Sequence, residues 1–286
     1  MSKAHVKEGV ARVIFTIAAA VSIAAVALIC IFLFANGVPA MAEIGLPEFL
    51  FGTTWRPSND IYGIFPMIVG SIYVTAGAII VGVPIGLLTA IFLSRFSNGK
   101  ISAVLKPGVE LLAGIPSVIY GFFGLMVIVP FIRDNMPGNG YSLLAASVLL
   151  GIMILPTIIT VSQSALDAVP KQYYEGSLAL GAGHERSVFS VVVPAASSGI
   201  LAGVVLGIGR AIGETMAVIM VAGNQTVIPD SIFDGVRTMT ANIVLEMGYA
   251  ADLHRGALIA TGVVLFVFVL IITLCVNAIK RSSEVK

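Results

Sequence analysis

Two opposite charges lie inside a long apolar stretch of the chain. Arg210 and Glu214 are four residues apart in a run built otherwise of glycine and aliphatic side chains. On a continuous helix this spacing puts both side chains on one face, where they can form an ion pair. A charge at the centre of a bilayer costs about 2.5–3.5 kcal/mol on insertion scales, so residues of this kind are functional by default.

The sequence leaves two interpretations of this pair open. In the first, Glu214 only neutralises Arg210, and the two charges hold helices together. In the second, Arg210 lies on the path of an anion, because its planar guanidinium matches phosphate oxygens, and Glu214 orients or releases the ion. The second interpretation predicts a substrate pathway that includes both residues.

A second pattern lies in the polar segment that precedes this stretch. Glu175 is followed by Gly181 and then by Pro194, with a helix-compatible stretch before the glycine. We expect a helix over 171–180 between Pro170 and Gly181, because proline suits a first helical turn and glycine adopts positive φ at little cost. A second short helix is expected to lead the chain back to the membrane at Pro194. An ordinary loop of two helices is the alternative interpretation.

The rest of the chain has the composition of a membrane protein. Of its 286 residues, 58% are hydrophobic and 11% are charged, whereas about a quarter of the residues in soluble proteins are charged. Mean hydropathy is +1.03. Apolar runs of about 20 residues, enough to cross a bilayer as a helix, are expected near 13–35, 64–94, 109–132, 142–165, 195–222 and 256–279. A water-soluble domain is excluded, and an all-α polytopic membrane protein with six transmembrane helices is predicted.

The distribution of Lys and Arg predicts the orientation of these spans. Six spans place both termini on one side, and the loops there hold most of the basic residues; the opposite loops hold only Arg56, Arg133, Arg237 and Arg255. By the positive-inside rule both termini are cytoplasmic. We therefore expect a cytoplasmic N-terminus over 1–12, a first span over 13–35 and an external loop over 36–63. A core of five spans follows over 64–279, with a cytoplasmic loop over 166–194, and the chain ends in a cytoplasmic tail over 280–286.

Glycines recur at four-residue spacing in the span that carries the charges. Gly199, Gly203 and Gly207 form one series, and Gly209 and Gly213 form a second. Such spacing lets another helix backbone approach closely. Helix packing therefore explains these glycines without any role in transport.

The last external loop, about 223–255, is expected to contain one more helix. Its stretch Met239–Glu246 is compatible with a helix and follows a segment that mixes proline and charged residues. We expect this helix to lie on the surface or to re-enter the membrane.

Signals for other kinds of chemistry are weak. Nothing resembles Gly-x4-Gly-Lys-Ser/Thr, so the chain binds no nucleotide by that route. The three histidines lie outside the expected spans, and no nucleophile constellation is visible. Cys30 and Cys275 fall inside expected spans, where they act as small packing residues. We expect no catalytic site, no metal site and no bound cofactor in the chain itself.

Both polar patterns resemble those of known transporters. The segment from Glu175 to Pro194 resembles the cytoplasmic coupling loop of ABC importer permeases, with Gly176 and Ser177 in place of two alanines. Gly-Arg-Ala-Ile-Gly-Glu, followed by Thr-Met-Ala-Val and Ala-Gly-Asn, resembles the phosphate permeases of the PstC type. The strings Gly-Ile-Pro-Ser-Val-Ile-Tyr-Gly, which ends at Gly121, and Phe-Gly-Thr-Thr-Trp, which ends at Trp55, are similar to the same family.

This resemblance implies the type I ABC importer permease (MetI-like) fold and one half of the pathway of an ATP-driven inorganic phosphate importer. Glu175, Gly181 and Pro194 then couple the chain to a separate ATPase, which binds ATP and Mg²⁺. The implied partners are one PstA-type permease, two PstB-type ATPases, a PstS-type phosphate-binding protein, inorganic phosphate and membrane lipid, with no nucleic acid. The implied location is the cytoplasmic (inner) membrane of a bacterium or archaeon.

Two alternatives stay open at this point. The chain could serve as an ABC permease for another oxyanion such as sulfate or molybdate, which charge alone does not separate from phosphate. It could instead be an ion-driven secondary anion transporter that uses Arg210 and Glu214 directly. The second alternative has no need of a coupling loop, so the 175–194 segment argues against it.

Overall fold

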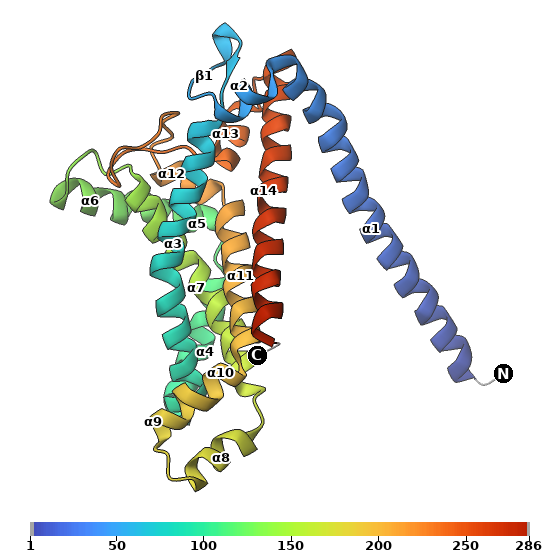
Figure 1. Ribbon diagram of the computed structural model, residues 1–286, viewed down its shortest axis with the longest axis vertical. Coiled ribbons are helices and arrows are strands. Elements are labelled where there is room, and N and C mark those ends of the chain that lie inside the picture. Colours follow the sequence, from blue (N-terminus) through green and yellow to red (C-terminus); the bar gives the residue numbers. More distant parts are fainter. Residues whose placement is uncertain (1–2, 285–286) are drawn as a thin grey trace.

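The computed structural model describes residues 3–284 and, within them, the side chains of 11–275 and Ala278. The chain is a helical bundle with one short hairpin, β1 (Trp55–Arg56) paired with β2 (Ile61–Tyr62). The hairpin lies at one end of the molecule and α8 (Lys171–Ala179) at the other (Figure 1). Within these residues, five helical segments are long and apolar enough to span a membrane, and a bent pair of helices makes a sixth when it is counted as one span. The expected all-α polytopic membrane fold is confirmed.

The first half of the chain contains three of these segments. Its helices are α1 (Lys3–Ile44), α2 (Leu46–Phe51), α3 (Phe65–Ile91), α4 (Gly99–Gly114), α5 (Ser117–Phe123) and α6 (Val129–Asn135). A short 3₁₀ turn at Pro57–Asn59 joins the two strands. π-helical turns at Phe92–Phe96 and Gly124–Ile128 extend α3 and connect α5 to α6.

The second half begins with the central helix of the bundle. Its helices are α7 (Leu143–Asp167), α8, α9 (His184–Ser187), α10 (Val193–Ala195), α11 (Ser197–Gly213), α12 (Met216–Val221), α13 (Met239–Glu246) and α14 (Asp252–Glu284). A π-helical turn at Val188–Val192 links α9 to α10. The expected helix at Met239–Glu246 is confirmed as α13.

The third membrane helix begins later in the chain than its hydropathy indicates. The apolar run expected from about 109 is broken between Gly114, where α4 ends, and Ser117, where α5 begins. Proline disfavours helical geometry in the residue before it, and Ile115, which precedes Pro116, is extended at φ −71°, ψ 126°. The segment that could span the membrane is therefore Ser117–Asn135.

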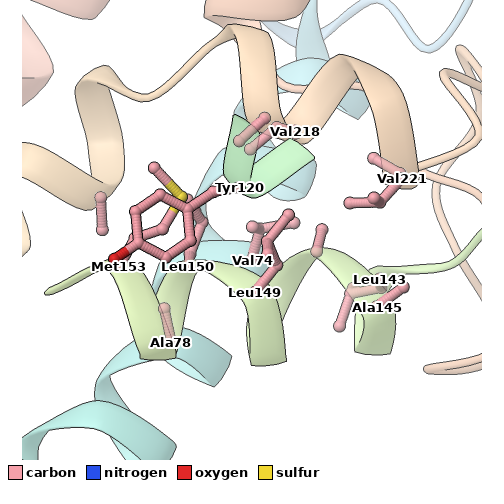
Figure 2. Close-up of a cluster of buried hydrophobic side chains, with 14 of the residues drawn as sticks. Val74, Ala78, Tyr120, Leu143, Ala145, Leu149, Leu150, Met153, Val218 and Val221 are labelled. Atoms are coloured by element: carbon pink, nitrogen blue, oxygen red, sulfur yellow. The ribbon is translucent and has the colours of Figure 1, made fainter. Parts of the chain in front are cut away.

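Close packing around α7 holds the bundle together. α3 and α11 pack along α7, and the side chains at the centre of the bundle are aliphatic and almost fully buried. Figure 2 shows part of this core, with Leu149, Leu150 and Met153 of α7, Tyr120 of α5, and Val218 and Val221 of α12. The core brings the start of α5, the start of α12 and the end of α11 to the same region.

α1 leaves the bundle toward the end that carries α8. It packs on α14 near its own C-terminal end, where a Cβ at Gly37 would lie 2.6 Å from Val263. Toward the N-terminus it diverges from α14 (Figure 1), and its side chains from residue 12 to residue 29 are exposed. α1 begins and α14 ends in the half of the molecule that contains α8 (Figure 1), as six spans require.

Candidate functional site

A break in the fifth membrane segment separates the two charged residues. α11 ends at Gly213, and Glu214 has an extended backbone at φ −69°, ψ 132°. Thr215, at φ −124°, ψ −59°, then begins α12. The apolar run expected as one helix over 195–222 is therefore two helices with an extended step between them. Broken helices of this kind at membrane depth occur in transporters where backbone groups line a path.

The break corrects the predicted geometry of the pair. Arg210 and Glu214 do not share a helix face, and no ion pair joins them within the part of the chain whose side chains are described. Instead Glu214 Oε1 accepts a hydrogen bond from the amide of Ala217 at 3.2 Å. The Glu214 carboxylate thus caps the first turn of α12, where a negative charge is favoured by the helix dipole.

Arg210 lies in the last turn of α11 and is half-buried. At 1.5 Å per residue it is about 20 Å from the start of that helix. A positive charge is favoured at a helix C-terminus. Among the described side chains, however, its guanidinium has neither an ion-pair partner nor a hydrogen-bond acceptor. Within the described residues its charge therefore stays unpaired.

Tyr120 is a neighbour of Arg210 to which sequence reasoning gave no role. Its hydroxyl donates to Leu112 O at 2.8 Å across the break between α4 and α5, and its side chain lies in the same buried cluster as Ala211, the residue after Arg210. Next to it, a Cβ at Gly121 would lie 3.0 Å from Ala217 Cα, so α5 and α12 pack closely there. The only sign in the sequence that Tyr120 lies near this site is the Ile-Pro-Ser string that precedes it.

The two glycine series of α11 differ in what they face. A Cβ at Gly203 would lie 3.1 Å from Ser162 Oγ, and one at Gly207 would lie 3.0 Å from Ile158, so both glycines pack on α7. Gly209 and Gly213 have no atom of the described chain within 4 Å of such a Cβ. Helix packing within the chain explains the first series only. The second lies beside Arg210 on a face that the described part of the chain leaves uncovered.

The polar segment before α11 forms a compact turn with the conformation expected from the sequence. Gly181 has φ +89°, which confirms the predicted positive φ. Its amide donates to Leu178 O at 2.9 Å, and the amide of Ala182 donates to Ser177 O at 3.2 Å. These two bonds are those of the Schellman motif, which ends helices at glycine. α8 is therefore a short helix with a sharply defined end.

α8 is attached to α9 by polar contacts and leaves an apolar tip exposed. Tyr174 Oη lies 2.7 Å from His184 Nδ1, and Ser187 Oγ donates to Ser177 Oγ at 3.0 Å. Leu180, directly after α8, is 92% exposed. A leucine this exposed at the tip of a rigid helical turn is suited to a groove on another protein.

The three residues predicted to couple the chain to an ATPase are not in mutual contact. Glu175 is exposed on α8, Gly181 forms the turn, and Pro194 is exposed in α10. The segment His184–Ala195 then bends by 70° into α11. The loop is thus continuous with the helix that carries Arg210. Within the described residues, no three His, Cys, Asp or Glu side chains are grouped as metal ligands.

Comparison with known proteins shows what this arrangement is similar to. Residues 82–284 match the family model described as "Binding-protein-dependent transport system inner membrane component". The probable ABC transporter permease protein YqgH of Bacillus subtilis is 42% identical over 96% of this chain and 91% of its own length. The phosphate transport system permease protein PstC of Mesorhizobium japonicum is 35% identical over 88% of this chain and 82% of its own length.

A solved structure has the same overall fold. The bacterial alginate ABC transporter, crystallised with a periplasmic protein that carries an alginate pentasaccharide, contains a chain that matches with a TM-score of 0.61 at 15% identity. The match covers 93% of this chain and 94% of that one. The MetI-like permease fold that the sequence implied is confirmed.

Proposed function

The chain belongs to the family of binding-protein-dependent transport system inner membrane components, and from this premise we propose that it is the PstC-type permease of an ATP-driven inorganic phosphate importer. Membership of the family makes it a non-catalytic permease subunit of an ABC importer in a cell membrane. Similarity to proteins named as phosphate permeases supports phosphate as the substrate.

The guanidinium of Arg210 is the single observation that carries this proposal. It is a positive charge at membrane depth without a partner in the described chain, next to a break in its own helix. An oxyanion that passes this point supplies the missing negative charge and can accept two parallel hydrogen bonds from the planar guanidinium. Glu214, held at the start of α12, limits how long the anion stays by repelling it.

The same loop that leads into α11 supports coupling to an ATPase. In this proposal α8 docks in a groove of a PstB-type ATPase, with Glu175 on its exposed side, Gly181 at the turn and Pro194 at the membrane. The ATPase binds ATP and Mg²⁺ and hydrolyses the nucleotide. Because the 70° bend joins this loop directly to α11, movement of α8 reaches the helix that carries Arg210.

The remaining partners complete the pathway. One PstA-type permease covers the face of α11 that carries Gly209 and Gly213, two PstB-type ATPases bind at the cytoplasmic end, and a PstS-type receptor delivers phosphate outside. In this arrangement both termini and α8 are cytoplasmic, and the β1–β2 hairpin is external. The alginate transporter, crystallised with its periplasmic protein, supports an assembly of this kind.

Reconstitution tests the proposal. The chain is incorporated into proteoliposomes with PstA-type, PstB-type and PstS-type subunits, and uptake of labelled phosphate is measured with and without ATP. We expect uptake that requires both ATP and the receptor and that excess sulfate or molybdate leaves unchanged. Uptake of one of those oxyanions in place of phosphate overturns the substrate, and uptake driven by an ion gradient without ATP overturns the transport class.

A further inference from the structure

A buried carboxylate joins four segments of the chain at the end opposite α8. Glu246, the last residue of α13, is 6% exposed. Its Oε2 accepts a hydrogen bond from Trp55 Nε1 at 2.9 Å and lies 2.9 Å from His254 Nε2. Its Oε1 forms an ion pair with Arg237 Nη1 at 2.6 Å. We call these four residues the Glu246 cluster.

The Glu246 cluster fixes positions more than it adds stability. A buried ion pair is often no more stabilising than apolar side chains of the same size, but loss of one partner leaves a charge unpaired and is strongly destabilising. Here Arg237 balances Glu246, and the Tyr62 and Tyr249 rings lie 6.0 and 5.9 Å from the ring of His254. The cluster therefore holds the β1–β2 hairpin, α13 and α14 in one arrangement.

The first turn of α13 is bonded to the break beside Arg210. Thr240 Oγ1 donates to Glu214 O at 3.1 Å. At the far end of α12, Arg237 Nε donates to Asn224 O at 2.9 Å. The carbonyl of Glu214, before α12, and that of Asn224, after it, thus both accept hydrogen bonds from residues in or just before α13. Residues at both ends of α12 are therefore bonded to the first turn of α13 or to Arg237 just before it, so the two helices are suited to move together.

The hairpin is exposed at its tip and anchored at its base. The Trp55 and Tyr62 side chains are buried and pack with ring centroids 5.6 Å apart. Arg56 and the segment 58–61 are exposed, and the hairpin projects from this end of the molecule (Figure 1). The hydrogen bond from Trp55 to Glu246 is therefore a direct buried connection between an accessible surface and α13.

We propose that Trp55 and Glu246 are positioning residues that transmit contact at the hairpin to the break at Glu214. The partner at the hairpin is the external binding protein of the importer, and in this respect the inference rests on the proposed function. When that protein displaces the hairpin, Trp55 moves Glu246 and α13, and Thr240 carries the shift to Glu214. Transmission of this kind needs an element with two positions, and that element is the α12–α13 pair.

Two variants of the same hairpin test this transmission. Trp55→Phe keeps an aromatic ring but removes the N–H that binds Glu246. Tyr62→Phe removes a hydroxyl whose bond, to Asp60 Oδ1 at 3.1 Å, stays within the hairpin. Burial, together with that bond, raises the pKa of Tyr62 to about 12, so the control removes a donor that remains protonated in any transport assay.

The first measurement is stimulation of ATP hydrolysis by the liganded receptor in the reconstituted complex, expressed relative to the basal rate of each variant. We expect Trp55→Phe to reduce the stimulation at least about tenfold, the lower end of the effect of losing a hydrogen bond to a charged group, and Tyr62→Phe to retain it. Receptor affinity is measured in parallel and is expected to stay within about twofold in both variants. Wild-type stimulation in Trp55→Phe, or an equal loss in both variants, overturns the inference.

Amide hydrogen exchange supplies a second measurement that needs no substrate. In the detergent-solubilised complex, Trp55→Phe is expected to speed exchange in residues 216–224, and Tyr62→Phe is not. Unchanged exchange in Trp55→Phe overturns the inference even when phosphate uptake by the wild type is established. Absence of phosphate uptake by the wild type, in contrast, counts against the proposed function and leaves the exchange result to decide the transmission.

Discussion

Arg210 and Glu214 lie on opposite sides of a break between two helices, although only three residues separate them. Arg210 belongs to the last turn of α11, and the Glu214 carboxylate caps α12 through the amide of Ala217 at 3.2 Å. Each charge is therefore stabilised by the helix end that suits its sign. Arg210 and Glu214 therefore do not neutralise each other. The guanidinium of Arg210 is left available to an anion.

Loss of the cap should depend on the oxygen of Glu214 more than on its charge. Glu214→Gln keeps an acceptor for the amide of Ala217, whereas Glu214→Leu removes it. We expect Glu214→Leu to lower the free energy of unfolding by about 1 kcal/mol, the usual worth of a helix cap, and Glu214→Gln to lower it by much less. Thermal unfolding of the solubilised chain measures both. Equal loss in the two variants contradicts the capping role.

The break itself was not predictable from the sequence. The break lies within an apolar run long enough for a continuous span, and the spacing of Arg210 and Glu214 fits a helical ion pair equally well. In the structure the backbone at the break is held by a tertiary bond from Thr240 to Glu214 O, between residues 26 positions apart. Local patterns carry no information about such partners.

Features that depend on local conformation were predicted successfully. The positive φ of Gly181 follows from the need to turn sharply between two helices, and the limits of Met239–Glu246 follow from local composition. The Glu246 cluster was missed, because the bond from Trp55 to Glu246 joins residues 191 positions apart. Tyr120 was noticed only as part of a string, since its place near Arg210 depends on how α5 packs.

Gly181 and Gly183 offer a matched test of the coupling loop. At neither glycine does an added Cβ lie within 4 Å of an atom of the described chain beyond its own neighbours, but Gly181 has φ +89° and Gly183 has φ −72°. Only at Gly181 does a β-branched side chain strain the backbone. We expect Gly181→Val to insert in the membrane but to retain little ATPase in a pull-down, and Gly183→Val to behave as wild type. Full ATPase retention together with full transport in Gly181→Val contradicts the coupling assignment.

The two glycine series should separate folding from transport. A side chain at Gly203 meets Ser162 Oγ and Val161, whereas one at Gly209 meets no atom of the described chain. Gly203→Val should destabilise the isolated permease by about 1–3 kcal/mol, as overpacked cores do, and Gly209→Val should leave its thermal unfolding unchanged. Gly209→Val should instead reduce uptake in the reconstituted complex. Wild-type uptake by Gly209→Val would mean that the face of α11 around Gly209 borders neither the pathway nor the second permease.

The orientation of the chain can be tested with cysteine substitutions in a background that lacks Cys30 and Cys275. Ser58 and Ser231 are exposed near the hairpin end, and Ser190 is exposed near α8. With both termini cytoplasmic, an impermeant thiol reagent added outside intact cells should label Ser58→Cys and Ser231→Cys but not Ser190→Cys. Labelling of Ser190→Cys alone would show the opposite orientation, in which α8 lies outside the cytoplasm.

Phosphate uptake by Arg210 variants in the four-subunit proteoliposomes tests the central claim most directly. Because no ion pair joins Arg210 to Glu214 in the described structure, Arg210→Met does not leave a directly paired carboxylate behind and should insert and bind the ATPase normally. The pathway role predicts almost no ATP-dependent uptake by Arg210→Met and partial uptake by Arg210→Lys, which keeps the charge but loses the planar fork. Near wild-type uptake by Arg210→Met contradicts the claim that Arg210 lies on the path of the anion.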